Sequence, residues 1–119
     1  VLIENKFLTY ISILENYHKN NVSKNGFLKS RLTYLLEKSS IKDKLNDIGK
    51  FSERLKVTRN YHAHLEEKHK EKSLDSGEIF KANNLLEFVI REIFLREIGI
   101  IENSKISSKM NEYIKTLSE

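Results

Sequence analysis

The feature that most restricts the fold is the absence of proline from 119 residues, together with a count of only four glycines. Proline interrupts helices, and a chain of many short strands needs more turn residues than this sequence has. Apolar residues recur at helical spacing along most of the chain. We therefore expect an all-α fold, a compact bundle of four to five helices.

The spacing of the apolar residues divides the chain into helical stretches. Helices are predicted over about 2–19, 27–38, 50–61 or slightly beyond, 78–98 and 104–117. Residues 41–48 form either a separate short helix or an extension of the third one. The stretch 78–98 is apolar over a wide arc, so we expect it to lie centrally in the bundle or to be shared with a partner chain.

Two helix ends carry specific signals. Asp75 is followed three residues later by Glu78, which is the pattern of a capping box at the start of the fourth helix. Gly99 is a natural stop at the other end of that helix, and Asn103 or Ser104 can cap the last one. We find no internal repeat and no interior linker, so residues 1–119 are predicted to be a single domain.

The chain begins at Val1, without Met and within a helical pattern, so we expect it to be the C-terminal part of a longer protein. It has no Cys, which excludes disulfides and thiolate metal sites. Its apolar runs are too short for a membrane span, and no signal peptide is visible. We therefore expect a cytoplasmic protein that does not engage a membrane.

Charged residues leave several alternatives open. The net charge of +4 permits nucleic-acid binding without demanding it. The densest basic stretch begins at Lys68 but is interleaved with glutamates, so it is either a solvated loop or an RNA-binding patch that uses Lys68 and Lys70. Arg31 is either an RNA contact in the same cleft as Arg59 or a surface arginine. His18, near the end of the first helix, is predicted to be a surface or capping histidine.

The strongest chemical signal is the hexamer Arg59-Asn60-Tyr61-His62-Ala63-His64, at the end of the third predicted helix. Arginine binds phosphate oxygens through a forked set of donors, and histidine can exchange a proton near neutral pH. Together these groups can hold a phosphodiester and move its protons.

Helical geometry restricts how these side chains can meet. Arg59 and His62 are three residues apart and share a face, whereas Arg59 and His64 are about 140° apart around a regular helix. Either the helix ends near His62, or Arg59 and His64 meet with the help of a second chain.

Histidines and glutamates between residues 62 and 69 are residue types that zinc sites use. However, no Glu-flanked pair of helical histidines and no Cys partner accompanies them. The chain also lacks a Gly-rich phosphate loop and a nucleophile elbow. We therefore expect no metal and no other cofactor.

Other stretches accompany the hexamer in a fixed order: Leu14-Glu15-Asn16-Tyr17-His18, Arg31-Leu32, Thr58-Arg59-Asn60-Tyr61 and Glu97-Ile98-Gly99-Ile100. The set resembles the HEPN domain of the ApeA type, and the hexamer resembles the Arg-x-x-x-x-His signature of HEPN domains. The resemblance covers nearly the whole chain up to about residue 102. HEPN toxins carry a Tyr two residues after the signature His, where this chain has Glu66, which favours the ApeA type.

The resemblance implies a metal-independent endoribonuclease. It assigns His64 as general acid or base and Arg59 as the phosphate clamp, with Asn60 orienting the pair. Tyr61 and His62 are second candidates. Tyr61 either stacks on a base or packs in the core, and His62 either shares the proton transfer or fills the helix end.

The implied reaction uses the 2′-hydroxyl of RNA as nucleophile and leaves a 2′,3′-cyclic phosphate and a 5′-hydroxyl. The resemblance also implies a homodimer whose two signatures face one cleft. It further implies an upstream sensor domain and a role as a toxic effector in prokaryotic antiphage defence by abortive infection. The substrate would then be cellular RNA, such as tRNA.

The alternative is a non-catalytic HEPN module for dimerisation or RNA binding. In that case the Arg59–Asn60 pair ties the helix to a neighbour, and His64 completes a buried hydrogen-bond network.

Overall fold

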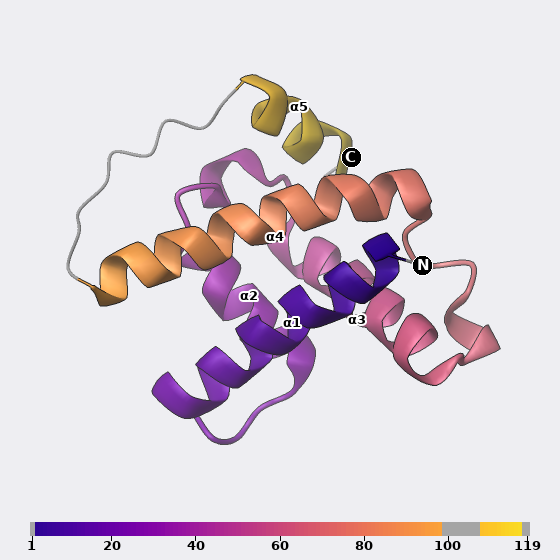
Figure 1. The fold of residues 1–119 in the computed structure, drawn as a ribbon, viewed down its shortest axis with the longest axis horizontal. Coiled ribbons are helices and arrows are strands. Elements are labelled where there is room, and N and C mark those ends of the chain that lie inside the picture. Colours follow the sequence, from indigo (N-terminus) through magenta and orange to yellow (C-terminus); the bar gives the residue numbers. More distant parts are fainter. Residues whose placement is uncertain (1, 99–107, 118–119) are drawn as a thin grey trace.

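The structure, a computed structural model, describes residues 2–98 and 108–117. Within these residues it contains helices and no strand (Figure 1): α1 (Leu2–Asn21), α2 (Leu28–Glu37), the 3₁₀ turn η1 (Lys42–Lys44), α3 (Ile48–His64), the 3₁₀ turn η2 (Glu67–His69), α4 (Ser76–Glu97) and α5 (Ser108–Leu117). The prediction of an all-α bundle is confirmed. The predicted helix stop at Gly99 and the cap at Asn103 or Ser104 lie outside the described residues.

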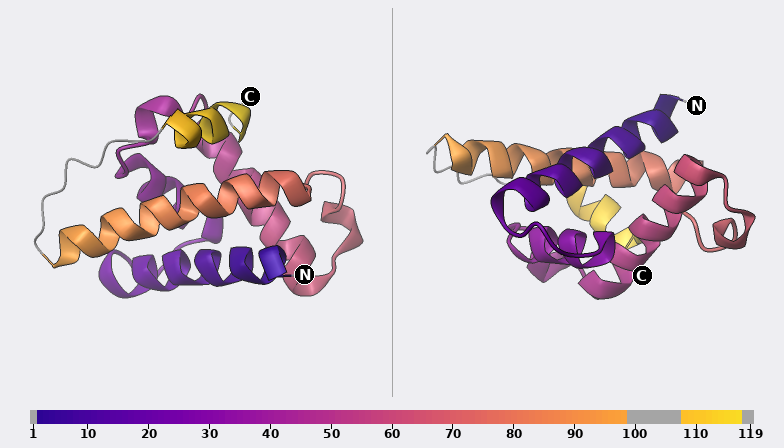
Figure 2. Two further views of the ribbon diagram at one scale, coloured as in Figure 1. Left: turned by 45° about the horizontal axis from the view of Figure 1, so that its top comes forward. Right: turned by 90° about the horizontal axis from the view of Figure 1, so that it is seen from below.

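Helices α1 and α4 lie side by side and run in the same direction. Helices α2 and α3 pack against each other and against α1, and α5 packs on α4 (Figure 2). The C-terminal end of α3 therefore lies near the N-terminal end of α1. The C-terminal ends of α1 and α4 lie together at the opposite end of the molecule (Figure 1).

A single hydrophobic core receives side chains from all five α-helices. Burial of a large aliphatic or aromatic side chain contributes about 1.5–3 kcal/mol, so this core provides most of the force that holds the helices together. The largest fully buried side chains are Phe7, Ile11, Leu14, Leu32, Leu36, Ile41, Phe51, Leu55, Ile79, Leu85, Leu86 and Ile114.

Side-chain caps define the starts of two helices. The capping box of α4 is confirmed: the Asp75 carboxylate accepts from the Glu78 N–H at 2.8 Å, and the Glu78 carboxylate accepts from the Asp75 N–H at 3.1 Å. Helix α3 starts slightly earlier than predicted, at Ile48, because the Asp47 carboxylate accepts from the Lys50 N–H at 3.0 Å.

Of the two alternatives for residues 41–48, the separate short helix is the one observed, as the 3₁₀ turn η1, and Ile41 and Leu45 on either side of it enter the core. Phe27, the first residue of the helix predicted over about 27–38, instead precedes α2 as its N-cap and is 83 % exposed. Phe94 is 61 % exposed because the last turns of α4 project beyond α2 (Figure 1).

Candidate active site at the end of helix α3

The C-terminal half of α3 is tied to the start of α4. The hydroxyl of the fully buried Thr58 donates to the Arg54 carbonyl at 2.7 Å and accepts from the Leu74 N–H at 2.9 Å. Arg54 also pairs with the Glu78 carboxylate, at 3.0 Å, in the first turn of α4. These contacts fix the position of the helix turns that carry residues 59–64.

Arg59 and Asn60 follow directly and are both half-buried. The Nε atom of Arg59 is shielded from solvent and has no hydrogen-bond acceptor among the described residues. Leaving a buried donor unpaired costs about 1–3 kcal/mol. Arg59 forms no hydrogen bond or ion pair with the other described residues, and its side chain is only half-buried, so the accessible part of the side chain can bind an external anion.

Tyr61 and His62 hold each other in an edge-to-face contact, with ring centroids 4.9 Å apart and an interplanar angle of 70°. Both side chains are half-buried. His62 also interacts electrostatically with Glu4, in the first turn of α1. The N-terminal end of α1 therefore borders the region of the signature, and His62 is the histidine of the hexamer that faces it.

His64 is exposed and forms no hydrogen bond or ion pair with the other described residues. Helix α3 stays regular through His64 and ends at Leu65, which has the left-handed dihedrals φ 52° and ψ 38°. The side chains of Arg59 and His64 therefore diverge by about 140° around the helix axis. The alternative in which the helix ends near His62 is wrong, and so is the one in which His64 completes a buried network.

Lys68 and Lys70, the predicted RNA contacts, are exposed in the loop that joins α3 to α4. This loop packs against α3 through η2. The Glu66 carboxylate lies 4.0 Å from the Lys68 amine and 2.9 Å from His69 Nε2, so it offsets part of the local positive charge. The loop adjoins the signature, and its lysines remain predicted RNA contacts.

Arg31 is not a surface arginine, because it is only 5 % exposed. Its guanidinium donates to two carbonyls of the α1–α2 loop, at 2.8 and 3.1 Å, and to His18 Nδ1 at 3.0 Å. Glu4 and His18 are separated by about 21 Å along α1. Glu4 lies near His62 and so marks the end of α1 that is next to the signature. Arg31 contacts His18 and therefore lies at the other end of α1. It does not share a cleft with Arg59.

His18 is the partner of Arg31 and is buried rather than at the surface. Its ring packs edge-to-face on Tyr34, with centroids 5.1 Å apart. Arg31 has only donors to offer, so His18 Nδ1 must accept, and the ring must be neutral with its proton on Nε2. Burial, followed by the positive charge of Arg31, lowers the pKa of His18 below its ordinary value of 6.5.

This pair predicts a loss of stability in mild acid. Because the pKa of His18 is lower in the folded state, the unfolded state binds more protons below about pH 6.5. The free energy of unfolding should therefore fall as the pH decreases from about 6.5 toward the folded-state pKa. Urea unfolding at about pH 5 and pH 7.5 measures this difference.

The matched variants are His18→Asn, whose Oδ1 can replace Nδ1 as acceptor, and the exposed His64→Asn. We expect His18→Asn to lose this part of the pH dependence and His64→Asn to keep it. An unchanged pH dependence in His18→Asn contradicts the assignment.

A second polar cluster, centred on Glu92 of α4, was not among the residues predicted from the sequence. This carboxylate is buried, accepts from the Ser39 hydroxyl at 2.5 Å and from the Ser40 N–H at 3.3 Å, and lies 3.7 Å from Arg96. The signal for it was present, because Glu92 continues the buried stripe of α4 at helical spacing after Val89. A carboxylate on an apolar stripe predicts a buried polar contact.

In the part of the chain that the structure describes, no three His, Cys, Asp or Glu side chains are grouped so that they could hold a metal ion. None of the helices described is long and apolar enough to cross a membrane.

Comparison with known proteins gives one family. The model of the family described as Apea-like HEPN matches residues 8–104, a range that includes the whole of α2, α3 and α4 and the Arg59–His64 hexamer. Comparisons with curated proteins and with solved structures gave no match.

Proposed function

The chain belongs to the Apea-like HEPN family, and on that premise we propose that it is a metal-independent endoribonuclease. The observation that carries the proposal is the Arg-x-x-x-x-His signature on the last turns of α3. There, a half-buried arginine precedes an exposed histidine, and neither forms a hydrogen bond or ion pair with the other residues that the structure describes. Membership of the family supports this activity, because HEPN domains serve as ribonuclease effectors in defence.

In the proposed reaction, RNA supplies its own nucleophile, the 2′-hydroxyl. His64 takes the proton of the 2′-hydroxyl and returns a proton to the 5′-oxygen as it leaves, a role that typically contributes ~10²–10⁴-fold to the rate. Arg59 stabilises the charge that develops on the non-bridging phosphate oxygens, and Asn60 orients the pair. The 2′-oxygen forms a bond to phosphorus as the bond to the 5′-oxygen breaks, which leaves a 2′,3′-cyclic phosphate and a 5′-hydroxyl.

A second copy of the chain completes the proposed site. Arg59 and His64 diverge by about 140° on one helix, so they cannot both approach one phosphate from the same chain. In a two-fold dimer that pairs the ends of α3, Arg59 of one protomer faces His64 of the other. Tyr61 and His62 lie between them on the helix and are second candidates for base stacking and proton transfer.

The proposed biological role is that of a toxic effector in antiphage defence by abortive infection. The substrate is cytoplasmic RNA, with tRNA as one candidate, and Lys68 and Lys70 are its proposed contacts beside the site. A sensor domain upstream in the full-length protein controls the activity. Arg31 is left out of the proposed RNA contacts, because its guanidinium is committed to the α1–α2 loop.

A second candidate function is a non-catalytic module that dimerises or binds RNA. The observation that favours it is the position of His64, which is exposed and turned away from Arg59 within one chain. This candidate predicts RNA binding without cleavage.

The test is incubation of the purified chain with end-labelled RNA in excess EDTA. We expect cleavage that persists in EDTA and products with cyclic-phosphate and 5′-hydroxyl ends. Cleavage that requires a divalent cation, or products with a 5′-phosphate, would contradict the proposed mechanism. RNA binding by a dimer without any cleavage would favour the second candidate.

A further inference from the structure

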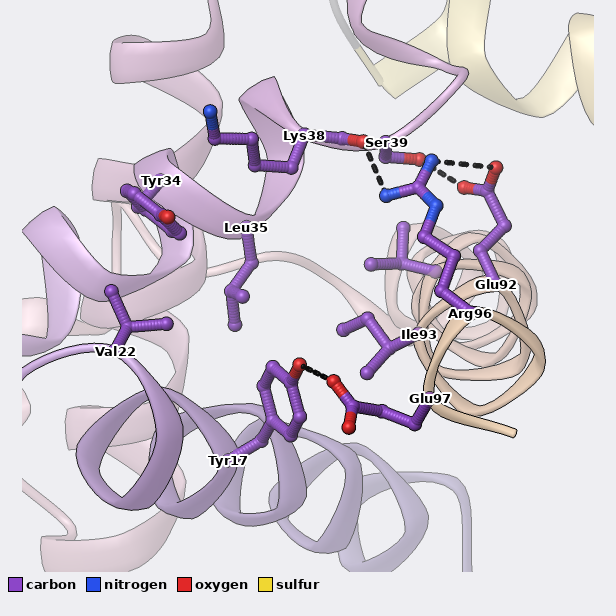
Figure 3. A pocket seen from close by; sticks show the side chains of 11 residues that line it. Tyr17, Val22, Tyr34, Leu35, Lys38, Ser39, Glu92, Ile93, Arg96 and Glu97 are labelled. Carbon is purple, nitrogen blue, oxygen red and sulfur yellow. Dashed lines mark hydrogen bonds and ion pairs between the residues drawn. The ribbon is translucent and has the colours of Figure 1, made fainter. Parts of the chain in front are cut away.

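A cavity of about 200 Å³ opens between the C-terminal ends of α1 and α4 and the end of α2 (Figure 3). It lies at the opposite end of the bundle from the signature. Glu78, which pairs with Arg54 of α3, and Glu97, which lines the cavity, are about 28 Å apart along α4. The cavity is therefore separate from the proposed nuclease site.

One side of the cavity presents a carboxylate with a free oxygen. The Tyr17 hydroxyl donates to Glu97 Oε1 at 2.6 Å. This hydrogen bond, with burial as the next cause, raises the pKa of Tyr17, so its hydroxyl stays a donor. The second oxygen of Glu97 has no hydrogen bond or ion pair among the described residues. Glu97 can therefore accept hydrogen bonds from a ligand.

The opposite side of the cavity presents a cation and a hydroxyl (Figure 3). The Lys38 amine lies 5.4 Å from the centre of the Tyr34 ring and is paired with no carboxylate in the described part of the chain. The Tyr34 hydroxyl likewise forms no hydrogen bond there. Both groups remain available to a ligand.

The remaining polar groups of the cavity are already satisfied and form a fixed frame. Arg96 donates to the Lys38 carbonyl at 2.7 Å and lies 3.7 Å from Glu92, which is held by Ser39. Leu35 lies between the two tyrosines and Ile93 on the α4 side near Glu97, and both add aliphatic surface to the cavity (Figure 3). Apolar and aromatic walls of this kind suit the faces of a flat ring.

We propose that the cavity binds guanine with an attached phosphate. Among the RNA bases, only guanine presents two adjacent N–H donors on its Watson–Crick edge, the arrangement that a carboxylate such as Glu97 accepts. Lys38, on the other side, can bind the phosphate as a point charge. The volume of about 200 Å³ suits the base alone, so the attached phosphate lies outside the cavity, on the side of Lys38. Binding of this kind does not require RNA cleavage.

The test is an NMR titration of the chain with the four 5′-mononucleotides and with inorganic phosphate. We expect guanosine monophosphate to bind at least about tenfold more tightly than the other three and to shift the amide signals of Tyr17, Tyr34, Lys38 and Glu97. Equal binding of all four nucleotides, the same shifts with phosphate alone, or shifts confined to residues 59–64 would overturn the proposal.

Two α4 glutamates provide a matched pair of variants. Glu97→Gln should reduce the preference for guanine about tenfold or more, because the amide presents a donor where guanine also has one. Glu87 accepts from the Tyr10 hydroxyl at 3.3 Å in a similar α1–α4 contact but lies outside the cavity, so Glu87→Gln should leave binding unchanged. Equal effects of the two substitutions would overturn the proposal.

The guanine can come from a free nucleotide or from an unpaired position in RNA. A 2′-O-methyl oligonucleotide with one guanine among uridines separates these sources, since it lacks the nucleophile and cannot be cleaved. Binding at least about tenfold tighter than guanosine monophosphate, with the same cavity shifts, identifies RNA, and weaker or equal binding identifies the free nucleotide. The same titration in His64→Ala should be unchanged, which separates this proposal from the proposed nuclease function.

Discussion

Replacement of His64 by alanine is expected to lower the rate of RNA cleavage by about 10²–10⁴-fold while leaving stability unchanged. His64 is exposed and contacts no other described residue through a hydrogen bond or ion pair, so its loss removes a proton-transfer group and little else. Arg59→Ala is expected to lower the rate by about 10²–10³-fold, because charge on the phosphate oxygens is then no longer stabilised. Single-turnover cleavage of labelled RNA measures both, with thermal unfolding as the check on folding.

His62→Ala is the matched control for His64→Ala. His62 is half-buried against Tyr61 and near Glu4, so its removal should affect stability more than that of His64 and cleavage less than about tenfold. If cleavage is lost only in His62→Ala, the proton transfer belongs to His62, which shares a helix face with Arg59. Unchanged cleavage in His64→Ala refutes its assignment as acid or base.

Glu92→Ala is expected to lower the free energy of unfolding by about 3 kcal/mol. Its carboxylate is buried and accepts from both the Ser39 hydroxyl and the Ser40 N–H, and Arg96 lies beside it. The substitution leaves these donors without an acceptor, and it disconnects α4 from the turn that follows α2. Urea unfolding monitored by circular dichroism gives the difference.

Glu87→Ala is the control on the same helix. Its carboxylate is about half exposed, pairs with Arg91 at 3.6 Å and accepts from the Tyr10 hydroxyl at 3.3 Å, so its loss is expected to cost only about 1 kcal/mol. A loss in Glu92→Ala as small as that in Glu87→Ala would show that the buried contacts of Glu92 contribute little to stability.

Most of the helices could be predicted from sequence because their signals are local. Apolar spacing depends only on helical periodicity, and the Asp75–Glu78 capping box depends on residues within one turn. The end of α3 was harder to predict, because it ends at Leu65 in a left-handed conformation that is usually taken by glycine. A leucine at that position gives no signal of a helix end.

The residues of the proposed site could be named from the hexamer, but their surroundings could not. The burial of Arg31 depends on how the α1–α2 loop returns over its guanidinium, and the position of Glu92 depends on the turn after α2. Both are contacts between distant elements: the stripe of α4 indicates that Glu92 is buried, but no local pattern identifies its partners Ser39 and Ser40. For the same reason, the nearness of Glu4 to His62 could not be predicted, because it depends on how α1 packs against α3.

The most direct test of the central claim, a nuclease site shared by two chains, is a mixture of two inactive variants. Arg59→Ala and His64→Ala are each expected to be inactive alone, because each homodimer lacks one kind of group on both protomers. In a coexpressed mixture, half of the dimers are mixed and hold one intact Arg59–His64 pair across the interface. RNA cleavage in this mixture is expected to return to roughly a quarter of the wild-type rate. A mixture as inactive as either variant alone, or full cleavage by a wild-type monomer, would contradict a site shared by two chains.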